Sequence, residues 1–463
     1  MSKRSRHQTA MQPAEMRASL SLSSIYALRM LGMFLVLPVL ALYAHNLPGA
    51  ADNKMLVGLA LGMYGLTQAL LQLPLGMASD RFGRKNVIYL GLVVFATGSF
   101  MAAAADSLEM LVAARAVQGA GAVSAAVTAL LADLTREEVR TRAMAMVGLS
   151  IGLVFAFSMA LAPVMNRLIG VPGIFILTGV LTLMALAVVR FWVPAEPQYH
   201  RVHEDAEVQR AHIGTVLRNT QLLRLHFGIF SLHAAQMALF VALPFLLVEV
   251  GLVKEDHWQL YLPAVVAGLV LMVPAIIYGE TRQKLKAVFV AGIVAVLVAQ
   301  SGLAFSVASF TMILSAMVLY FIGFNILEAS LPSMVSKIAP AGLKGTAMGV
   351  YNTAQSLGLF FGGALGGAVY QHFDRTGVFV FCGVLMLLWL AVAVTAPAPP
   401  AVRNLMFAVG SRWRGAEAEL AAQLKQLDGV TEVSFSADKA SVYVKALQRR
   451  VDEAAVAKLI LGA

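Results

Sequence analysis

Long apolar segments separated by short polar stretches occupy most of the chain. Each segment is close to the roughly 20 residues that an α-helix needs to cross the hydrocarbon core of a bilayer. The pattern predicts an all-α membrane protein with twelve transmembrane helices in two sets of six. The segments lie at about 20–44, 54–78, 86–105, 108–131, 143–165, 170–193, 222–249, 259–278, 286–306, 310–335, 345–370 and 377–396.

The polar stretches between these segments divide the chain into parts. We expect a cytoplasmic tail at 1–19, one six-helix half at 20–193, a cytoplasmic linker at 194–221 and a second six-helix half at 222–397. The first segment is longer than the apolar part of a secretory signal, so we expect it to be retained as a helix. Residues 398–463 differ in character and form the last part.

This last part combines strand-like and helix-like patterns. Strands are indicated at 405–409, 430–435 and 441–444, and helices at 417–427 and 451–461. The order β-α-β-β-α predicts a small α+β domain of the ferredoxin-like type. Small metal carriers of this type use a cysteine pair that is missing here, so we expect no metal site. A regulatory or assembly role and a passive folded tail are both open, with the partner of the domain unknown.

Basic residues are distributed unequally between the two sides of the predicted bundle. With the amino terminus inside, the loops on that side hold most of the lysines and arginines, and the opposite side receives Lys54, Arg167, Lys254 and Arg375. Cytoplasmic loops of membrane proteins are enriched in lysine and arginine. We therefore predict a multi-pass protein of a bacterial-type inner (plasma) membrane with both termini in the cytoplasm.

The composition excludes several classes of protein. The 463 residues are 59% hydrophobic and 13% charged, whereas a soluble globular protein is about 25% charged. In a membrane protein the net charge of +10 orients helices and attracts anionic lipid, so we expect no nucleic acid partner. Cys382 is the single cysteine, and no ATP-binding G-x-x-x-x-G-K-[ST] motif occurs. We predict no enzyme activity and no cofactor, with a proton gradient as the energy source.

The polar stretch between the second and third segments carries the most specific motif. It reads G-x-x-x-D-R-x-G-R-K, with the fixed positions occupied by Gly76, Asp80, Arg81, Gly83, Arg84 and Lys85. This hinge motif resembles the signature of the major facilitator superfamily, whose members are secondary transporters of twelve helices. The fold expected from the resemblance is therefore the 6+6 arrangement that the hydropathy pattern predicts.

The resemblance also implies a gate contact on the cytoplasmic side. In the family the hinge aspartate lies close to the start of the eleventh helix, here near Gly345, where unpaired N–H groups carry a partial positive charge. We expect Gly76 to let the second and eleventh helices approach closely, and Asp80 to accept hydrogen bonds from that helix start. We expect Arg84 to pair with Asp133. This contact favours the outward-open state; the alternative is that the charges only fix the topology.

A second motif, R-x-x-Q-G-x-G, is formed in the fourth segment by Arg115, Gln118, Gly119 and Gly121. It resembles a superfamily motif whose arginine is proposed to tune proton transfer. The alternative is that Arg115 snorkels to the outer surface of the membrane. The G-P-x-x-G-G motif of drug/proton antiporters is degenerate here, where the fifth segment contains Ala162-Pro163.

Polar side chains inside the predicted segments are costly unless they face a cavity or a partner. Glu328 is the one carboxylate well inside a segment, and we predict that it carries the coupling proton. Arg29 is expected to be its counter-charge or to bind an anionic substrate, with a purely structural Arg29–Glu328 pair as the alternative. In the superfamily the first, fourth, seventh and tenth helices line the central cavity, which implies a substrate cavity lined by Phe34, Gln118, His233, Gln236 and Asn325.

The segments, the two motifs and the carboxy-terminal domain are together similar to the YajR-type efflux transporters of the superfamily, over nearly the whole chain. The resemblance implies proton-coupled export of a small, largely apolar compound by alternating access, with the lipid bilayer, protons and that compound as partners. Proton-coupled uptake of a metabolite or sugar is one alternative. A membrane sensor with the carboxy-terminal domain as its output is another.

Overall fold

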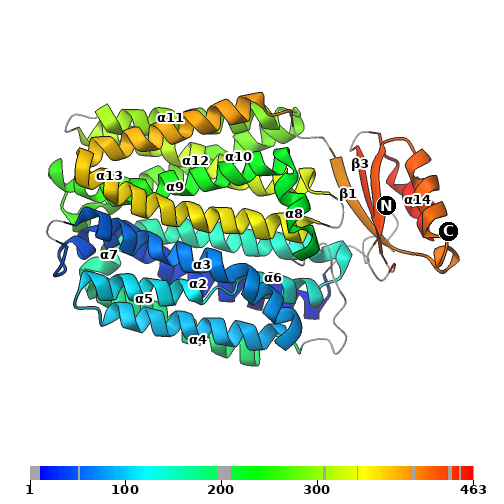
Figure 1. Cartoon of the computed structure of the whole chain (residues 1–463), viewed down its shortest axis with the longest axis horizontal. Coiled ribbons are helices and arrows are strands. Elements are labelled where there is room, and N and C mark those ends of the chain that lie inside the picture. Colours follow the sequence, from blue (N-terminus) through cyan, green and yellow to red (C-terminus); the bar gives the residue numbers. More distant parts are fainter. Residues whose placement is uncertain are drawn as a thin grey trace.

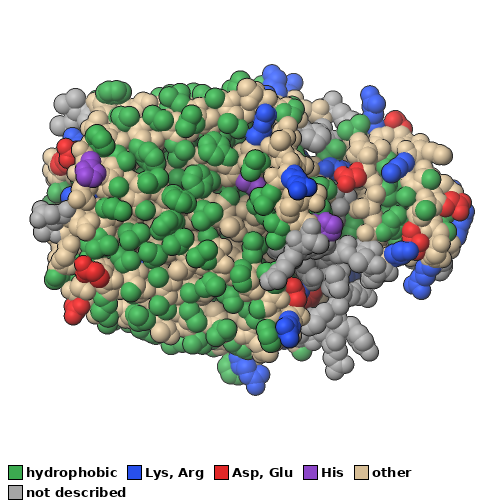
Figure 2. All heavy atoms as spheres, viewed as in Figure 1, with side chains coloured by type: hydrophobic (Ala, Val, Ile, Leu, Met, Phe, Trp, Pro, Cys, Tyr) green, Lys and Arg blue, Asp and Glu red, His purple; other side chains and the backbone are tan. Residues whose placement is uncertain are grey.

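The computed structural model describes residues 11–50, 53–195, 210–305, 309–340, 343–398, 402–435, 439, 441–447 and 450–461. Long helices form one bundle, and a small domain of sheet and helices lies at one end of it (Figure 1). Hydrophobic side chains cover the outside of the bundle (Figure 2), as expected for a surface that faces lipid. Most of the predicted tail, and residues 196–209 of the predicted linker, lie outside the described residues.

Within the described residues, ten helical spans are long and apolar enough to cross a membrane. In the first half they are α2 (Pro13–His45), α3 (Lys54–Phe82), α4 (Arg84–Ala103), α5 (Leu108–Ala120) continued by α6 (Ser124–Asp133), and α7 (Glu137–Phe191). In the second half they are α9 (Thr220–Glu249), α10 (Trp258–Thr281), α11 (Leu285–Phe305), α12 (Phe310–Ile338) and α13 (Lys344–Thr395). The short helices α8 (Arg210–Arg218) and η1 (Lys254–Asp256) precede α9 and α10.

Two of these spans turn back and cross twice. α7 has 55 residues and α13 has 52, about twice the length that a bilayer requires. Each contains one residue outside helical geometry, Gly170 in α7 and Asp374 in α13. Ala143 and Val189, from the two arms of α7, pack in the same hydrophobic cluster. The described helices therefore make twelve crossings, and the predicted all-α membrane fold is confirmed.

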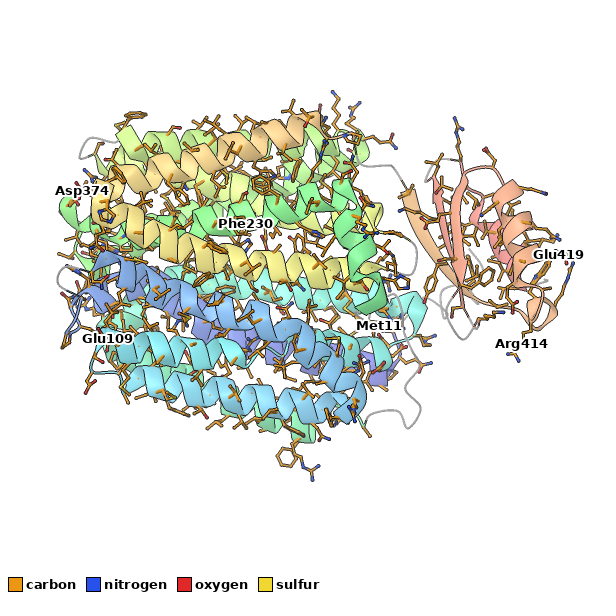
Figure 3. All side chains as sticks on the ribbon, in the orientation of Figure 1. Met11, Glu109, Phe230, Asp374, Arg414 and Glu419 are labelled. Atoms are coloured by element: carbon orange, nitrogen blue, oxygen red, sulfur yellow. The ribbon has the colours of Figure 1, made fainter. Side chains whose placement is uncertain are left out.

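The two ends of the bundle differ, and we name them by their position relative to the small domain. Met11 lies at the domain end, whereas Glu109 and Asp374 lie at the opposite end, which we call the far end (Figure 3). Because successive crossings alternate in direction, the hinge between α3 and α4 and the start of α13 both lie at the domain end.

The two halves of the bundle are packed together at the far end. Gly58, Gly62 and Gly65 of α3 face α13, and a side chain built on Gly62 would approach the carbonyl oxygen of Phe360 to 2.7 Å. Glycine is needed at such positions because it lets two helix backbones come close. Toward the domain end α3 and α13 diverge (Figure 1). The halves thus meet at the far end and separate toward the domain end.

The small domain has the predicted β-α-β-β-α order. Strands β1 (Val402–Ala408), β2 (Val430–Phe435) and β3 (Ser441–Leu447) form an antiparallel sheet in the order β1-β3-β2. The 3-10 turn η2 (Ser411–Trp413) leads to α14 (Glu417–Gln426), and α15 (Glu453–Leu461) ends the domain. Leu420, Val444 and Ile460 form its buried core. The α+β class predicted for this domain is confirmed.

Lys445 of β3 attaches the domain to the bundle. Its ammonium donates hydrogen bonds to the carbonyl oxygens of Ala339 (3.0 Å) and Ile338 (3.5 Å), at the carboxyl end of α12. The last carbonyl groups of a helix lack partners within the helix and carry partial negative charge, so a lysine stabilises this position. The Glu432 carboxylate lies 3.9 Å from the same ammonium. Burial lowers the pKa of Lys445 from its ordinary value, as expected for a lysine held in an interface.

We expect Lys445→Met to release the domain from the bundle. Removing a charged donor leaves the two carbonyl groups unpaired, which costs about 1–3 kcal/mol, while the domain keeps its own core. Spin labels at the exposed positions Ala422 in α14 and Arg282 after α10 should then give a broader and longer distance distribution. Lys425→Met, which removes an exposed lysine of α14, is the matched control. An unchanged distribution in Lys445→Met would show that other contacts hold the domain.

Candidate functional site

The hinge motif forms a cluster of charges at the domain end. Gly83, with a φ of 91°, separates α3 from α4 in a conformation that other residues rarely adopt. Arg84 begins α4 with 2% of its side chain exposed, and it donates a hydrogen bond to Ser79 Oγ (2.9 Å). Its guanidinium pairs with Asp80 and also with Asp133, where Nε lies 3.2 Å from Oδ2. The structure thus contains the expected Arg84–Asp133 pair, which joins the hinge to the end of α6.

The remaining motif residues contact their own half. Lys85 donates a hydrogen bond to a main-chain carbonyl just past the end of α7 (2.9 Å), and Arg81 lies 5.5 Å from the ring of its neighbour Phe82. Gly76 faces α6, because a side chain built on it would lie 2.9 Å from Cβ of Ala125. The expected close approach of Gly76 to the eleventh crossing is therefore wrong for this structure, in which Gly76 lets α6 pack against α3.

Asp80 also differs from the expectation. Its side chain is 39% exposed, and its partner is Arg84 of the same hinge. The N-cap residue of α13 is Leu343, whose side chain has no hydrogen-bond acceptor. Among the described residues no hydrogen bond or ion pair joins Asp80 to the start of α13, and α3 and α13 diverge toward the domain end. The gate contact between Asp80 and α13 stays a prediction for the state in which this end is closed.

A second polar cluster lies where three helices of the second half meet. Gln355 Nε2 of α13 is 2.8 Å from Nε2 of His233 in α9 and 3.5 Å from Oε1 of Glu328 in α12. The other carboxylate oxygen of Glu328 is 3.8 Å from His233 Nε2. The Glu328 side chain is 38% exposed, although α9 beside it is buried along nearly its whole length. The accessible part of the Glu328 side chain indicates an opening between the helices at this carboxyl cluster, although its Oε2 atom is itself buried.

The hydrogen bonds of His233 define its tautomer. Nδ1 lies 3.3 Å from the carbonyl oxygen of Ile229, which can only accept, so Nδ1 carries the hydrogen. Nε2 then offers its lone pair to the Gln355 amide, and the imidazole is neutral. A protonated Glu328 can donate to the same lone pair after a small side-chain rotation. The cluster can thus hold a proton on the carboxyl group or release it to water in the opening.

Aromatic rings adjoin the carboxyl cluster and connect the two halves. Phe34 of α2 lies 5.1 Å from Phe155 of α7, measured between ring centroids, and Phe155 stacks on Phe324 of α12 at 5.9 Å. Phe324 in turn lies 6.0 Å from the His233 ring. We call Phe34, Phe155 and Phe324 the aromatic row. Phe155 and Phe324 are buried and Phe34 is partly exposed, so the row presents its apolar surface beside the titratable carboxyl group mainly through Phe34. An apolar surface next to such a group suits a small apolar ligand.

Arg29 lies inside the first half and does not reach Glu328. It is 1% exposed, donates to the hydroxyl groups of Tyr64 (2.8 Å) and Ser124 (3.5 Å), and lies 4.9 Å from the ring centroid of Phe95. The expected Arg29–Glu328 pair is therefore wrong for this structure. The reason is that α2 turns this residue toward α3, α4 and α6 instead of toward the second half.

Arg115 and Gln118 of the second motif lie in the same interior. Arg115 is bound to the side-chain oxygen of Gln118 and to the carbonyl oxygen of Ala60 in α3 (3.3 Å). The Gln118 amide donates to Ser99 Oγ in α4 (2.8 Å). Both side chains are buried, so the snorkelling alternative for Arg115 and the cavity position expected for Gln118 are both wrong. This face of α5 packs against α3 and α4.

The two remaining cavity candidates are buried near the carboxyl cluster in sequence. Gln236 lies one turn after His233 in α9, and Asn325 lies one turn before Glu328 in α12. Their role in binding a substrate stays a prediction.

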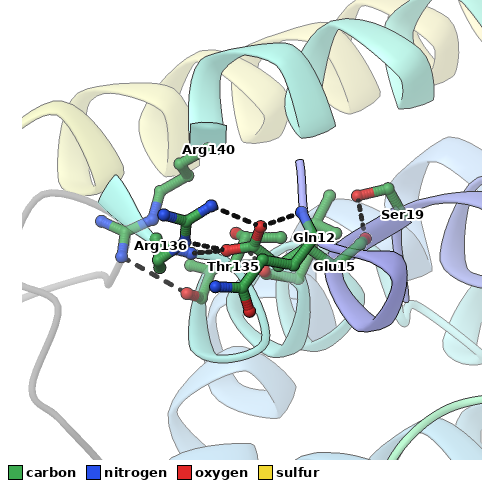
Figure 4. A network of polar contacts seen from close by, with 8 residues as sticks. Gln12, Glu15, Ser19, Thr135, Arg136 and Arg140 are labelled. Atoms are coloured by element: carbon green, nitrogen blue, oxygen red, sulfur yellow. Dashed lines mark hydrogen bonds and ion pairs between the residues drawn. The ribbon is translucent and has the colours of Figure 1, made fainter. Parts of the chain in front are cut away.

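An ion pair outside both motifs joins the start of α2 to the turn before α7 (Figure 4). The carboxylate of Glu15 accepts hydrogen bonds from Arg136 through Nε (2.8 Å) and NH2 (3.0 Å), and from the main-chain N–H of Arg136 (3.0 Å) and Gln12 (2.7 Å). A carboxylate with this many donors in a bidentate arrangement fixes the first and fifth crossings to each other. The sequence gives no signal for it, because 121 residues separate the two partners.

Residues 22–363 and 284–427 of the chain match the model of the Major Facilitator Superfamily. The chain belongs to this superfamily. It is 42% identical to the inner membrane transport protein YajR of Escherichia coli (strain K12), over 94% of this chain and 95% of that protein. It is 26% identical to multidrug resistance protein 1 of Bacillus subtilis (strain 168), over 80% of this chain and 93% of that protein.

Solved structures of major facilitator proteins share the fold. A bacterial homologue of the human lysosomal transporter Spinster superposes with a TM-score of 0.67 at 13% identity, over 83% of this chain and 97% of that chain. The predicted membership of the superfamily and the likeness to YajR-type transporters are confirmed. The protein is therefore a multi-pass membrane transporter and not an enzyme.

Sequence reasoning missed Gln355, the residue that connects the other two members of the carboxyl cluster. Its signal was an amide inside an otherwise apolar, glycine-rich segment, where a polar group needs a partner. The partner itself could not be chosen, because Gln355 lies 122 residues from His233 along the chain.

Proposed function

We propose that this major facilitator protein exports a small, largely apolar compound in exchange for protons, by alternating access. The observation that carries the proposal is the carboxyl cluster of Glu328, Gln355 and His233. It places one titratable carboxyl group in the opening between the helices, next to the aromatic row. Substrate surface and proton carrier then lie side by side, as coupling between them requires.

The domain end is proposed to be the cytoplasmic end. The basic hinge residues Arg81, Arg84 and Lys85 lie there, and so does the carboxy-terminal domain. Lysine and arginine near the ends of crossings favour the cytoplasmic side. With this orientation the close contact of the two halves faces the outside and the divergence of α3 and α13 faces the cytoplasm, as expected for the state in which an exporter loads its substrate.

The carboxyl cluster supports exchange of proton for compound. A protonated Glu328 is neutral and can donate to the lone pair of His233 Nε2 in place of the Gln355 amide, whereas the ionised carboxylate in a sparsely hydrated opening needs a further polar or charged partner. Water from the cytoplasm supplies such a partner once the proton has left, and a compound then enters along the aromatic row. When the outer side opens, a proton returns to Glu328 and the compound is released. Proton and compound thus occupy the site in alternation.

The proposal is tested with purified protein in lipid vesicles whose lumen is more acidic than the bath. The probes are apolar dyes and the permanently charged aromatic cation tetraphenylphosphonium, with protein-free vesicles as the control for passive partition. Exchange predicts uphill accumulation of a probe in the acidic lumen. Accumulation on the alkaline side would show uptake together with protons. No flux, with a probe-dependent change in hydrogen exchange of residues 402–461, would identify a sensor.

A further inference from the structure

Lys54 occupies an unfavourable position for a lysine. It is the first residue of α3, at the far end, and the partial positive charge of a helix start repels a cation. Within the described residues no carboxylate lies within ion-pair distance of its ammonium group, although Asp374 and Glu249 of the second half attract it from farther away. A charge retained in this place needs another source of stabilisation, and the structure supplies it from the opposite half of the bundle.

Two aromatic rings of the second half receive the Lys54 ammonium. Nζ lies 4.5 Å from the ring centroid of Phe245 in α9 and 4.9 Å from that of Tyr370 in α13. The two rings are 5.5 Å apart, and His45 of α2 packs edge-on against Phe245 at 5.4 Å. Both distances from the ammonium lie within the range in which an aromatic face attracts a cation. Lys54 of the first half is therefore held between α9 and α13, two helices of the second half. The chain does not connect the two halves at this end.

The neighbouring contacts explain how the rings reach the lysine. The main-chain N–H of Met55 donates to Oε1 of Gln371 (3.2 Å), and the glycines of α3 allow α13 to approach its backbone. These contacts depend on the shape of the two helices. The contact of Lys54 with Phe245 and Tyr370 depends in addition on charge, so it can be removed without changing the fit of the backbones.

We infer that Lys54, Phe245 and Tyr370 form the outer gate contact, a cation–aromatic clamp that holds the far end closed while the domain end is open. The inference rests on the alternating access proposed above, because the clamp joins the two halves across the surface that must part. A lysine is suited to a reversible contact of this kind. When the far end opens, its ammonium becomes hydrated at little cost, whereas a buried ion pair would leave two charges to be solvated.

The test measures the distance across the far end directly. In a Cys382→Ala background, spin labels are placed at Asp106 in the first half and Thr376 in the second, two exposed positions at this end. Lys54→Met keeps the length of the side chain and removes its charge; it should raise the ratio of open to closed far ends about tenfold. Lys54→Arg retains a cation and should resemble the parent.

A double-mutant cycle distinguishes the clamp from general packing. Phe245→Leu should open the far end in the parent but have little further effect in Lys54→Met, because the partner is already lost. Equal distance distributions in Lys54→Met and the parent would overturn the inference, as would an equal shift in Lys54→Met and Lys54→Arg. The measurement uses neither substrate nor proton gradient. A shift without proton-coupled flux would therefore support the clamp and refute the proposed exchange, and the reverse result would do the opposite.

Discussion

Replacing Glu328 by glutamine is expected to abolish proton-driven accumulation of the transported compound while downhill exchange of the same compound continues. Glutamine has almost the same shape and can still donate to His233, but it cannot take up or release a proton. Vesicles that hold Glu328→Gln and an acidic lumen should therefore accumulate no more compound than protein-free vesicles. Preloaded vesicles without a pH difference should exchange labelled for unlabelled compound as the parent does.

The control for this substitution is Glu280→Gln, which neutralises an exposed carboxylate at the end of α10. It should accumulate compound as the parent does. Uphill accumulation by Glu328→Gln would remove Glu328 as the proton carrier and direct attention to another titratable group of the opening. Loss of both accumulation and exchange would indicate that the carboxylate binds the compound, and Glu328→Asp would then be expected to restore both in part.

Asp80→Asn is expected to favour the state seen here, in which α3 and α13 diverge at the domain end. In this state Asp80 is exposed and bound to Arg84 of its own hinge, and the start of α13 has no capping side chain. When the domain end closes, the carboxylate is predicted to accept hydrogen bonds from that helix start. A charge at a helix terminus contributes about 1–2 kcal/mol when partly buried, so its loss should raise the ratio of open to closed domain ends roughly 5- to 30-fold.

This shift is measured with spin labels at Asn86 in α4 and Arg282 after α10, on opposite halves of the domain end. Asp106→Asn removes a carboxylate at the far end and is the matched control, with no expected shift. An unchanged distribution in Asp80→Asn would show that Asp80 fixes only the hinge. That result would leave Arg84–Asp133 as the functional part of the motif.

The sequence predicted the membrane fold well because hydropathy is summed over about 20 residues per crossing, and single substitutions hardly affect it. It also predicted the Arg84–Asp133 pair, which a motif with fixed spacing places at one end of adjacent helices. The sequence did not show which way single charged side chains face within the bundle. Arg29 and Arg115 both stand in apolar segments, but only the packed helices show that they face the interior of the first half.

The contacts between distant crossings could not be derived from the chain alone. Lys54 was placed on the outer side by its position, yet Phe245 and Tyr370 lie in other segments as ordinary aromatic residues. In the same way, no spacing rule connects His233 with Gln355. Such pairs depend on how the helices pack against each other in one state of the transport cycle. The residue pattern of a single helix does not specify that packing.

The exchange of proton for compound is tested most directly by recording lumenal pH and lumenal compound together, in weakly buffered vesicles that hold the purified protein and an acidic lumen. The account predicts that the lumen becomes less acidic as the compound enters, and that both changes disappear in Glu328→Gln. A lumen that becomes more acidic as the compound enters, or one whose pH does not respond to it, would contradict the account.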